Sequence, residues 1–330
     1  MNKGILIYAE VTKQDYLHTV FFELANKAQE LSKSLDNEPV IALLISKCGL
    51  VENYKEAFEK SSIDKVFVVE SDRLENYSTE LYTKSALEII EEIKPSIILI
   101  GATTQGRDLA PRLASLLHTG LTADCTELGI NDKGQLAATR PTFGGNLMAT
   151  ILCKNFPQMA TVRPRVLKPA QMDNAKNTEY IYKNINLDDM QPKVELIEFI
   201  KSLKSSINEL DSAEIIVAGG RGMKNAEGFT LLKEFADIIG ATVGASRVAV
   251  EMGLANHETQ IGQTGKSISP KIYIACGISG AIQHTIGIGD SKTIIAINND
   301  ENAQIFEHSD YKIVGDVFEI LPELTNLFKK

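Results

Sequence analysis

The residues best suited to hold a ligand follow four apolar segments in the C-terminal part of the sequence. These segments, at 213–218, 241–245, 271–276 and 293–298, each lead directly into a loop that contains Gly, Ser, Asn or Gln. Short apolar runs of this kind are typical of buried parallel strands, and open α/β sheets bind ligands in the crevice beyond the carboxyl ends of their strands. The sequence therefore predicts one binding site that all four loops share.

Two of these loops suit phosphate groups. The loop at 219–225 holds a Gly-Arg-Gly turn at Arg221 before a helical pattern, so its backbone could approach an anion closely while the guanidinium adds a planar donor. Position 225 is Asn, so the G-x-G-x-x-G fingerprint is incomplete, and a plain strand-to-helix turn is the alternative interpretation. The loop at 277–284 places small residues at a second predicted helix start, and two such anion sites would suit a dinucleotide pyrophosphate.

Two further loops are polar, and their Gln and Thr side chains offer neutral hydrogen-bonding groups rather than acids and bases. Ser246 and Arg247 follow the second apolar segment, and residues 260–266 contain two Gln and one Thr. Amides and hydroxyls suit recognition of a flavin ring edge better than hydrolysis, which needs a positioned base. An ordinary capped loop is the alternative interpretation of this composition.

Three isolated polar residues complete the candidate site. A single His such as His284 is usually a satisfied core residue, but its place one turn into a predicted anion-binding helix favours a ligand contact. Asn298 and Asp316 follow predicted strand ends, where such groups commonly meet ribose or adenine. Either could equally cap a helix.

The N-terminal part of the sequence predicts a larger sheet. Apolar runs at 4–9, 40–45, 65–69 and 96–100 alternate with helical patterns, which indicates a doubly wound parallel sheet. After a further predicted helix at about 107–117, a turn at 129–136 and strand-like runs at 146–152 and 158–163 predict a small antiparallel appendage.

A polar stretch at 168–193 has little hydrophobic periodicity and is interpreted as a connector between domains. The predicted fold class is therefore α/β: an N-terminal doubly wound parallel sheet with a small antiparallel appendage in residues 1–204, followed by a C-terminal Rossmann-like α/β domain in residues 205–330. The segment 317–330 is predicted to be an amphipathic helix.

Composition excludes several classes of function. The chain has 330 residues and a formal net charge of -9, which disfavours nucleic acid as a partner because phosphate binding needs a basic surface. No apolar run approaches the roughly 18 residues of a membrane span, and the N-terminus enters a strand-like run without a targeting leader, so a cytoplasmic location is expected. The four cysteines are far apart, which predicts reduced structural thiols rather than a metal site.

The C-terminal loops, taken together, resemble the alpha subunit of electron-transfer flavoproteins in their order and approximate spacing. The resemblance rests on the turn at Arg221, on Ser246 and Arg247, and on the segments 260–266, 277–284 and 290–298. It covers the whole C-terminal domain and extends less specifically into the N-terminal half. It implies FAD as the cofactor, extended across the rim of the C-terminal domain, and an electron carrier rather than an enzyme.

The resemblance also implies a role for individual residues. Arg221 and the segment 279–284 would contact the phosphates and ribityl chain, and Asn298 and Asp316 the adenosine end. Arg247 would lie over the isoalloxazine, Thr264 at its N5 edge and His284 near its C2 carbonyl, where positive charge favours the anionic reduced flavin. The full set of FAD-binding residues that we predict is Arg221, Ser246, Arg247, Gln260, Ile261, Gly262, Gln263, Thr264, Ser279, Gly280, Ala281, Ile282, Gln283, His284, Asn298, Asp316 and Val317.

Members of this family work as heterodimers with a smaller beta subunit, and an acyl-CoA or other dehydrogenase is the implied redox partner. The FAD domain is expected to swing about a hinge in the polar connector before Ile207. The segment 139–149 resembles the anaerobe branch, which suggests participation in electron bifurcation with NADH and ferredoxin through the beta subunit.

Two other classes of function compete with this interpretation. A nucleotide-dependent enzyme of the NAD type would need a nucleophile or general base, and the loops offer no Ser/His/Asp set or paired carboxylates. An adenine-nucleotide sensor on a similar sheet would bind AMP or ATP and purify without colour.

Overall fold

The computed structural model describes residues 3–13, 15–142, 147–170, 176–194, 196–198, 210, 213–289 and 291–329. They belong to two compact units: unit 1 takes Met1–Thr142 and Asn146–Phe199, and unit 2 takes Ile200–Lys330. The predicted domain boundary after 204 and the predicted hinge before Ile207 both lie outside the described residues.

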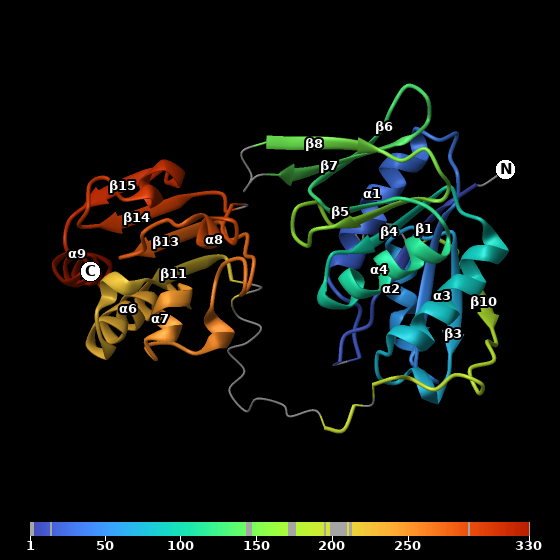
Figure 1. The fold of residues 1–330 in the computed structure, drawn as a ribbon, viewed down its shortest axis with the longest axis horizontal. Coiled ribbons are helices and arrows are strands. Elements are labelled where there is room, and N and C mark those ends of the chain that lie inside the picture. The colour runs from blue at the N-terminus through green and yellow to red at the C-terminus, as the bar shows by residue number, and fades with distance from the viewer. Residues whose placement is uncertain are drawn as a thin grey trace. The chain divides into compact units, whose positions relative to one another are not determined.

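Unit 1 is built on a seven-stranded sheet in which every pairing is parallel, in the order β10-β3-β2-β1-β4-β9-β5 (Figure 1). The four predicted apolar runs form its centre, as expected for strands with two covered faces. The strands are β1 (Ile5–Ala9), β2 (Val40–Ser46), β3 (Lys65–Glu70), β4 (Ile97–Gly101), β5 (Leu121–Cys125), β9 (Gln158–Val162) and β10 (Glu179–Lys183).

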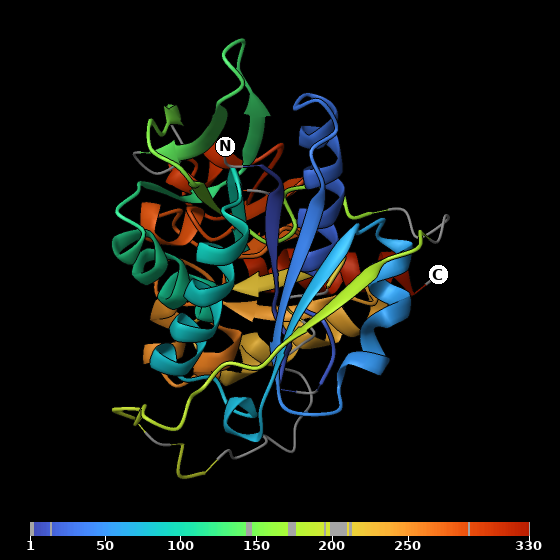
Figure 2. The same ribbon diagram turned by 90° about the vertical axis from the view of Figure 1, so that its right-hand side faces the viewer.

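Helices cover both faces of this sheet and close two hydrophobic cores. Figure 2 shows α3 and α4 on one side of the strands and α1 on the other. One core joins α1 and α2 to the sheet through Phe21 and Phe58, and the other joins α3 and α4 through Ile89 and Leu109. The helices are α1 (Val20–Lys33), α2 (Lys55–Lys60), α3 (Thr79–Ile93) and α4 (Thr104–Leu116).

The antiparallel appendage is confirmed for the hairpin but wrong for one strand. The small sheet contains β6 (Glu127–Ile130), β7 (Leu136–Thr142) and β8 (Leu147–Leu152). Residues 158–163 were also assigned to this appendage, yet β9 pairs in parallel with β4 and β5 inside the main sheet. The whole of β9 is buried, which is the environment of a central strand rather than of a hairpin exposed on one face.

The connector predicted at 168–193 is likewise partly wrong, because it contains β10, the edge strand beside β3. An edge strand has only one neighbour and needs less apolar sequence. Tyr180 packs against one core of unit 1 and Ile181 against the other, so this strand contributes side chains to both cores.

Unit 2 holds a five-stranded parallel sheet in the order β12-β11-β13-β14-β15. Its strands are β11 (Ile215–Gly219), β12 (Thr242–Ala245), β13 (Ile272–Cys276), β14 (Ile294–Asn298) and β15 (Tyr311–Val314). Helices α6 (Ala226–Ile239) and α9 (Val317–Phe328) pack together over one face, while loops and the short helices α7 (Arg247–Glu251) and α8 (Ile282–Thr285) complete the unit. The amphipathic helix predicted at the C-terminus is confirmed as α9.

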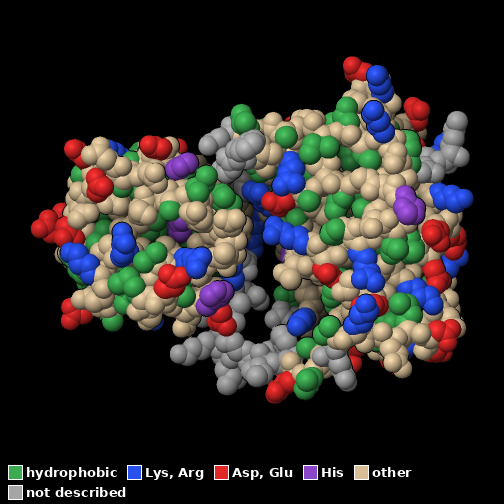
Figure 3. Space-filling view, in the orientation of Figure 1, with side chains coloured by type: hydrophobic (Ala, Val, Ile, Leu, Met, Phe, Trp, Pro, Cys, Tyr) green, Lys and Arg blue, Asp and Glu red, His purple; other side chains and the backbone are tan. Residues whose placement is uncertain are grey.

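The surface and the cysteines carry little specialised chemistry. Lys and Arg are interspersed with Asp and Glu on the face shown in Figure 3. None of the described helices is long and apolar enough to cross a membrane.

All four cysteines are free thiols. Burial raises the pKa of Cys125 and Cys276 to about 12, which makes these two thiols poor nucleophiles.

Candidate functional site

A cavity of about 790 Å³ lies at the carboxyl ends of the strands of unit 2. The strand order reverses direction between β11 and β13, and such a switch point leaves a crevice where doubly wound sheets bind ligands. The cavity is bounded by the loops that follow β11, β12, β13 and β14. Its volume is within the range of pockets that hold small molecules and cofactors.

Most of the predicted FAD-binding residues line this one cavity. Residues from all four loops come together there: Arg221, Ser246, Arg247, Gln260, Ile261, Gly262, Gln263, Thr264, Ser279, Ala281, Gln283, His284 and Asn298. Gly280, Ile282, Asp316 and Val317 are not among the lining residues. Arg221 and Asn298, which are 77 positions apart in the sequence, therefore line the same cavity, as expected for loops that follow parallel strands.

The Gly-Arg-Gly turn is shaped first by its packing against the loop after β13. A Cβ on Gly220 would lie 2.3 Å from the carbonyl oxygen of Gly277, and one on Gly222 would lie 2.7 Å from the Gly277 Cα. These two glycines are thus required for the close approach of two backbones. Arg221 between them is exposed and lines the cavity, where its guanidinium is available to an anion.

The start of α6, by contrast, is satisfied by its own chain. Asn225 Oδ1 accepts a hydrogen bond from Gly228 N at 3.0 Å, which occupies one of the free amides of the first turn. This explains why position 225 is Asn where a nicotinamide dinucleotide fingerprint would have Gly. The groups that this loop presents to the cavity are therefore Arg221 and the turn, and one amide of the helix start is already occupied.

The segment after β12 places one cation at the edge of the cavity. Ser246 caps α7, because its Oγ accepts from Ala249 N at 3.4 Å. Arg247 Nε donates to Glu251 Oε1 at 2.8 Å, and the two side chains are 64% and 58% exposed. An ion pair this exposed is weak, so the guanidinium can exchange its partner for a ligand.

The loop at 260–266 is fixed by backbone contacts with α8. Gln263 N donates to Gln283 O at 2.7 Å, and a Cβ on Gly262, whose φ is +134°, would lie only 2.5 Å from the same oxygen. Gln260 Nε2 donates to Thr264 Oγ1 at 2.9 Å. Since a hydroxyl that accepts can still donate its own proton, Thr264 offers a donor to the cavity.

His284 is buried, and the protein engages both of its ring nitrogens. Its Nδ1 lies 3.1 Å from Ile261 O, and its Nε2 lies 2.8 Å from the Tyr273 hydroxyl. A carbonyl oxygen only accepts, so Nδ1 carries a proton. Burial lowers the pKa of His284 to about 4 against the opposing effect of the Ile261 hydrogen bond, so the ring is neutral at pH 7.

Asn298 links the two loops on the far side of the switch point. Its Nδ2 donates to Ile278 O at 2.9 Å and its Oδ1 accepts from Asp300 N at 3.0 Å. The loop after β13 is held further by Gly280, where φ is +86° and a Cβ would lie 2.0 Å from Ile305 N. Asn298 therefore stabilises these two loops and also lines the cavity.

Asp316 is used as a helix cap. Its Oδ1 accepts from Phe318 N at 3.0 Å at the start of α9, and that hydrogen bond lowers the pKa of its carboxyl. The same side chain lies 3.5 Å from Lys224 Nζ. Its predicted contact with the adenosine end of a cofactor stays a prediction.

Sequence reasoning missed the continuation of the β14 loop. The cavity is also lined by Asn299, Asp300, Asn302, Ala303 and Gln304. These polar residues directly follow the apolar strand β14, and the same pattern identifies the other loops of the site. Extending the strand-end rule past Asn298 would have found them.

The lining suits binding of an anionic polar ligand. Its ionisable side chains within the described residues are Arg221, Arg247, Asp300 and the neutral His284. Two guanidinium groups and one carboxylate line the cavity, while Arg247 also pairs with Glu251, which is not a lining residue. Guanidinium groups are well suited to bind phosphate. His284 is not a free general base, because the protein engages both of its ring nitrogens.

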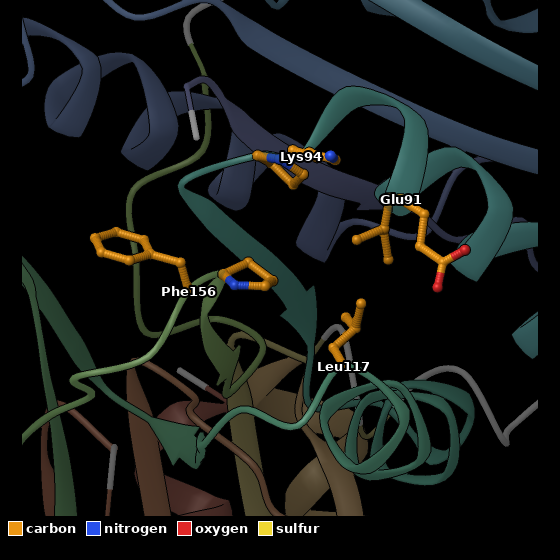
Figure 4. A pocket seen from close by; sticks show the side chains of 7 residues that line it. Glu91, Lys94, Leu117 and Phe156 are labelled. Atoms are coloured by element: carbon orange, nitrogen blue, oxygen red, sulfur yellow. The ribbon is translucent and has the colours of Figure 1, made fainter. Parts of the chain in front are cut away.

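A different kind of hollow lies at the amino ends of strands in unit 1 (Figure 4). It is lined by Ile90, Glu91, Lys94, Pro95, Leu117, Phe156 and Pro157. Aliphatic and aromatic groups dominate it, and only Glu91 and Lys94 carry charge. It has neither the position nor the polar groups of a ligand site in a parallel sheet.

Comparisons with known proteins match both units. Residues 5–184 match a family profile described as an electron transfer flavoprotein domain, and residues 209–289 match one described as an electron transfer flavoprotein FAD-binding domain. The chain is 46% identical to the electron transfer flavoprotein subunit alpha of Thermoanaerobacterium thermosaccharolyticum, covering 99% of this chain and 98% of the relative.

Two further relatives cover nearly the same length. The electron transfer flavoprotein subunit alpha of Megasphaera elsdenii is 47% identical, over 99% of this chain and 97% of the relative. A protein of Anaerotignum propionicum named acryloyl-CoA reductase electron transfer subunit beta is 39% identical, over 99% of this chain and 96% of the relative.

Proposed function

Because this chain belongs to the electron-transfer flavoprotein alpha-subunit family and serves in electron transfer, we propose that it carries FAD in the cavity of unit 2. The observation that carries this proposal is the convergence of four strand-end loops on one cavity of about 790 Å³. Its two arginines and its neutral hydrogen-bonding groups fit FAD, which contains both a pyrophosphate and a flavin ring.

The phosphate-binding part is the junction between the turn at Arg221 and the loop after β13. The packing of Gly222 on Gly277 brings the two backbones together there. Arg221 supplies a charge-assisted, planar donor. Ser279, which lines the same part of the cavity, adds a hydroxyl.

The flavin-binding part is formed by α7, the loop at 260–266 and α8. Flavin, when bound, supplies one-electron and two-electron chemistry, and the protein sets its potential through nearby charge and hydrogen bonds. Arg247 is the cation of this region, and Thr264 offers a hydroxyl donor. The neutral state of His284 leaves Arg247 as the source of the positive charge that favours reduced flavin.

The chain works in a heterodimer with an electron-transfer flavoprotein beta subunit, and a dehydrogenase such as an acyl-CoA dehydrogenase supplies its electrons. The names of its relatives as subunits support this part of the proposal. Participation in NADH-dependent bifurcation to ferredoxin is the finer hypothesis. This hypothesis would be supported if NADH reduced the heterodimer and if ferredoxin were reduced only when a high-potential acceptor was also present. A heterodimer that does not react with NADH would reject it.

The proposal is tested by purifying the chain with its beta partner, recording its visible spectrum during stepwise reduction and counting the FAD released per heterodimer. A yellow protein that takes up electrons one at a time supports the carrier function. One FAD indicates a simple carrier, and two indicate a partner that holds a second flavin. A colourless heterodimer that does not take up added FAD would overturn the proposal in favour of a nucleotide sensor or an NAD-type enzyme.

A further inference from the structure

Tyr273 connects the centre of the sheet in unit 2 to the wall of the cavity. It lies in β13, between Ile216 of β11 and Ile294 of β14, and its side chain is fully buried. A buried tyrosine hydroxyl needs a hydrogen-bond partner, because leaving it unpaired in an apolar core is costly. The partner is His284 Nε2, at 2.8 Å.

The direction of this hydrogen bond follows from the other ring nitrogen. Nδ1 must donate to Ile261 O, since a carbonyl cannot donate. In a neutral ring Nε2 then has a lone pair and no proton, so the Tyr273 hydroxyl donates to it. Burial of Tyr273 raises the pKa of its hydroxyl, which keeps that proton on the tyrosine.

The carbonyl of Ile261 is itself held in place. Ile261 N donates to Ala245 O at 2.9 Å, and the neighbouring Gly262 N donates to Lys266 O at 3.0 Å. The backbone of Gly262 packs against that of α8, where a Cβ would lie 3.3 Å from the His284 Cα. The imidazole is therefore clamped between two fixed groups from two different elements.

We infer that Tyr273 is a positioning residue of the cofactor site: its hydroxyl, with Ile261 O, fixes His284 as the neutral Nδ1–H tautomer, so that this ring presents no N–H and no charge to a bound ligand. The positive charge beside the cofactor then comes from Arg247, which lies outside this clamp. For its effect on a flavin potential the inference rests on the proposed function, but the tautomer itself does not depend on it.

The test uses the full chain with its beta partner, labelled with ¹³C,¹⁵N-histidine, and the variants Tyr273→Phe and Tyr8→Phe. Tyr8 is the matched control, because it is another buried strand tyrosine with a side-chain partner, Gln105, at 2.5 Å, but lies in unit 1. The His284 signals are identified by their loss in His284→Asn. The first one-electron potential of the flavin is measured on the same samples from pH 6 to pH 8.

In the unsubstituted protein we expect His284 to show a protonated Nδ1 and an unprotonated Nε2 throughout this pH range. Tyr273→Phe should release Nε2, giving a second tautomer or a titrating ring and a flavin potential whose pH dependence differs from that of the parent. Tyr8→Phe should change neither. A protonated Nε2 in the unsubstituted protein would overturn the inference, as would unchanged His284 signals and potential in Tyr273→Phe. A heterodimer without flavin would reject the proposed function, while the NMR signals would still decide the tautomer.

Discussion

The two units contain parallel sheets with the same kind of switch point, yet among the described residues the cavity there is small in unit 1 and large in unit 2. Unit 1 reverses its strand order between β1 and β4, and unit 2 between β11 and β13. At the carboxyl ends of the strands the cavity measures about 190 Å³ in unit 1 and about 790 Å³ in unit 2. The architecture provides a crevice in both cases, and the side chains decide whether it stays open.

In unit 1 the crevice is occupied by the protein's own polar side chains. Thr103 at the start of α4 donates to Glu10 after β1 at 2.5 Å, and Gln105 Nε2 donates to the Tyr8 hydroxyl at 2.5 Å. These contacts join β1 to α4 across the switch point. A ligand there would have to replace buried hydrogen bonds that are already made.

In unit 2 the loops after β11 and β13 contain glycines at which backbone packs closely on backbone. A Cβ would lie 2.0 Å from Ile305 N at Gly280 and 2.3 Å from Gly277 O at Gly220. Small residues thus do two things at once: they let distant loops join, and they leave space between them.

Gly280→Ala should have the largest effect. The new Cβ would lie 2.0 Å from Ile305 N, and a φ of +86° is strained for any residue with a Cβ. We expect unit 2 to lose roughly 2–5 kcal/mol of stability and to release FAD on mild warming. Thermal unfolding followed by flavin fluorescence measures this, with Gly289→Ala as the control because its nearest neighbour is Thr285 O at 3.7 Å. Equal stability of the two variants would contradict the packing argument.

Arg221→Ala should weaken FAD binding by about 10- to 100-fold, because a charge-assisted hydrogen bond to phosphate contributes roughly 1.5–3 kcal/mol. Equilibrium binding of FAD to the apoprotein measures the dissociation constant. Lys224→Ala is the matched control, since it removes a cation three positions away that pairs with Asp316 and does not line the cavity. A similar loss in both variants would mean that general charge, rather than a phosphate contact by Arg221, accounts for affinity.

Arg247→Ala should leave FAD bound but lower its first one-electron potential by tens of millivolts, since a positive charge beside reduced flavin is removed. Glu251→Gln should raise the potential, because it frees the same guanidinium from its partner at 2.8 Å. Both shifts should shrink at high salt. Spectroelectrochemical titration measures them, and an unchanged potential in both variants would reject this role for Arg247.

Glu10→Gln in unit 1 should have no effect on flavin binding and a distinct effect on stability. Burial raises the pKa of Glu10 from 4.5 to about 7 in the folded protein. Between these values the unfolded chain ionises first, so the contribution of Glu10 to stability is complete below pH 4.5 and is lost as the pH rises through 7. Removing the carboxyl should therefore stabilise the protein at pH 8 by roughly 1–3 kcal/mol relative to pH 4.5.

Urea unfolding at several pH values measures this difference. If the pH dependence of stability were the same with Gln at position 10, the buried carboxyl would not be its source. A change in FAD content would show instead that the crevice of unit 1 communicates with the cofactor.

Much of this fold could be predicted from the sequence because its central strands are continuous apolar runs. β1 to β4 and β11 to β14 were found in this way. β9 and β10 were assigned wrongly because their placement is decided by partners distant in the chain: β9 fills the gap between β4 and β5, and β10 follows the exposed edge of β3. Five-residue strands carry too little pattern to reveal such partners.

The site was predictable to the extent that strand ends must meet at one edge of a sheet. That rule predicts that the loops from Arg221 to Asn298 line one site, and applied further along the chain it also predicts Asn299 to Gln304. It could not reveal how the side chains are used inside the protein. The capping of α6 by Asn225 and the clamp on His284 depend on contacts whose geometry only the folded chain defines.

The central claim, that the cavity of unit 2 holds the flavin, is tested most directly by photolabelling. FAD with a photoactivatable azide on its dimethylbenzene ring would be bound to the heterodimer and irradiated, and the labelled peptides of this chain mapped by mass spectrometry. We predict label in unit 2, within peptides that cover 246–266 or 277–285. Bound, irradiated flavin that labels unit 1 and leaves these peptides unmodified would contradict the account.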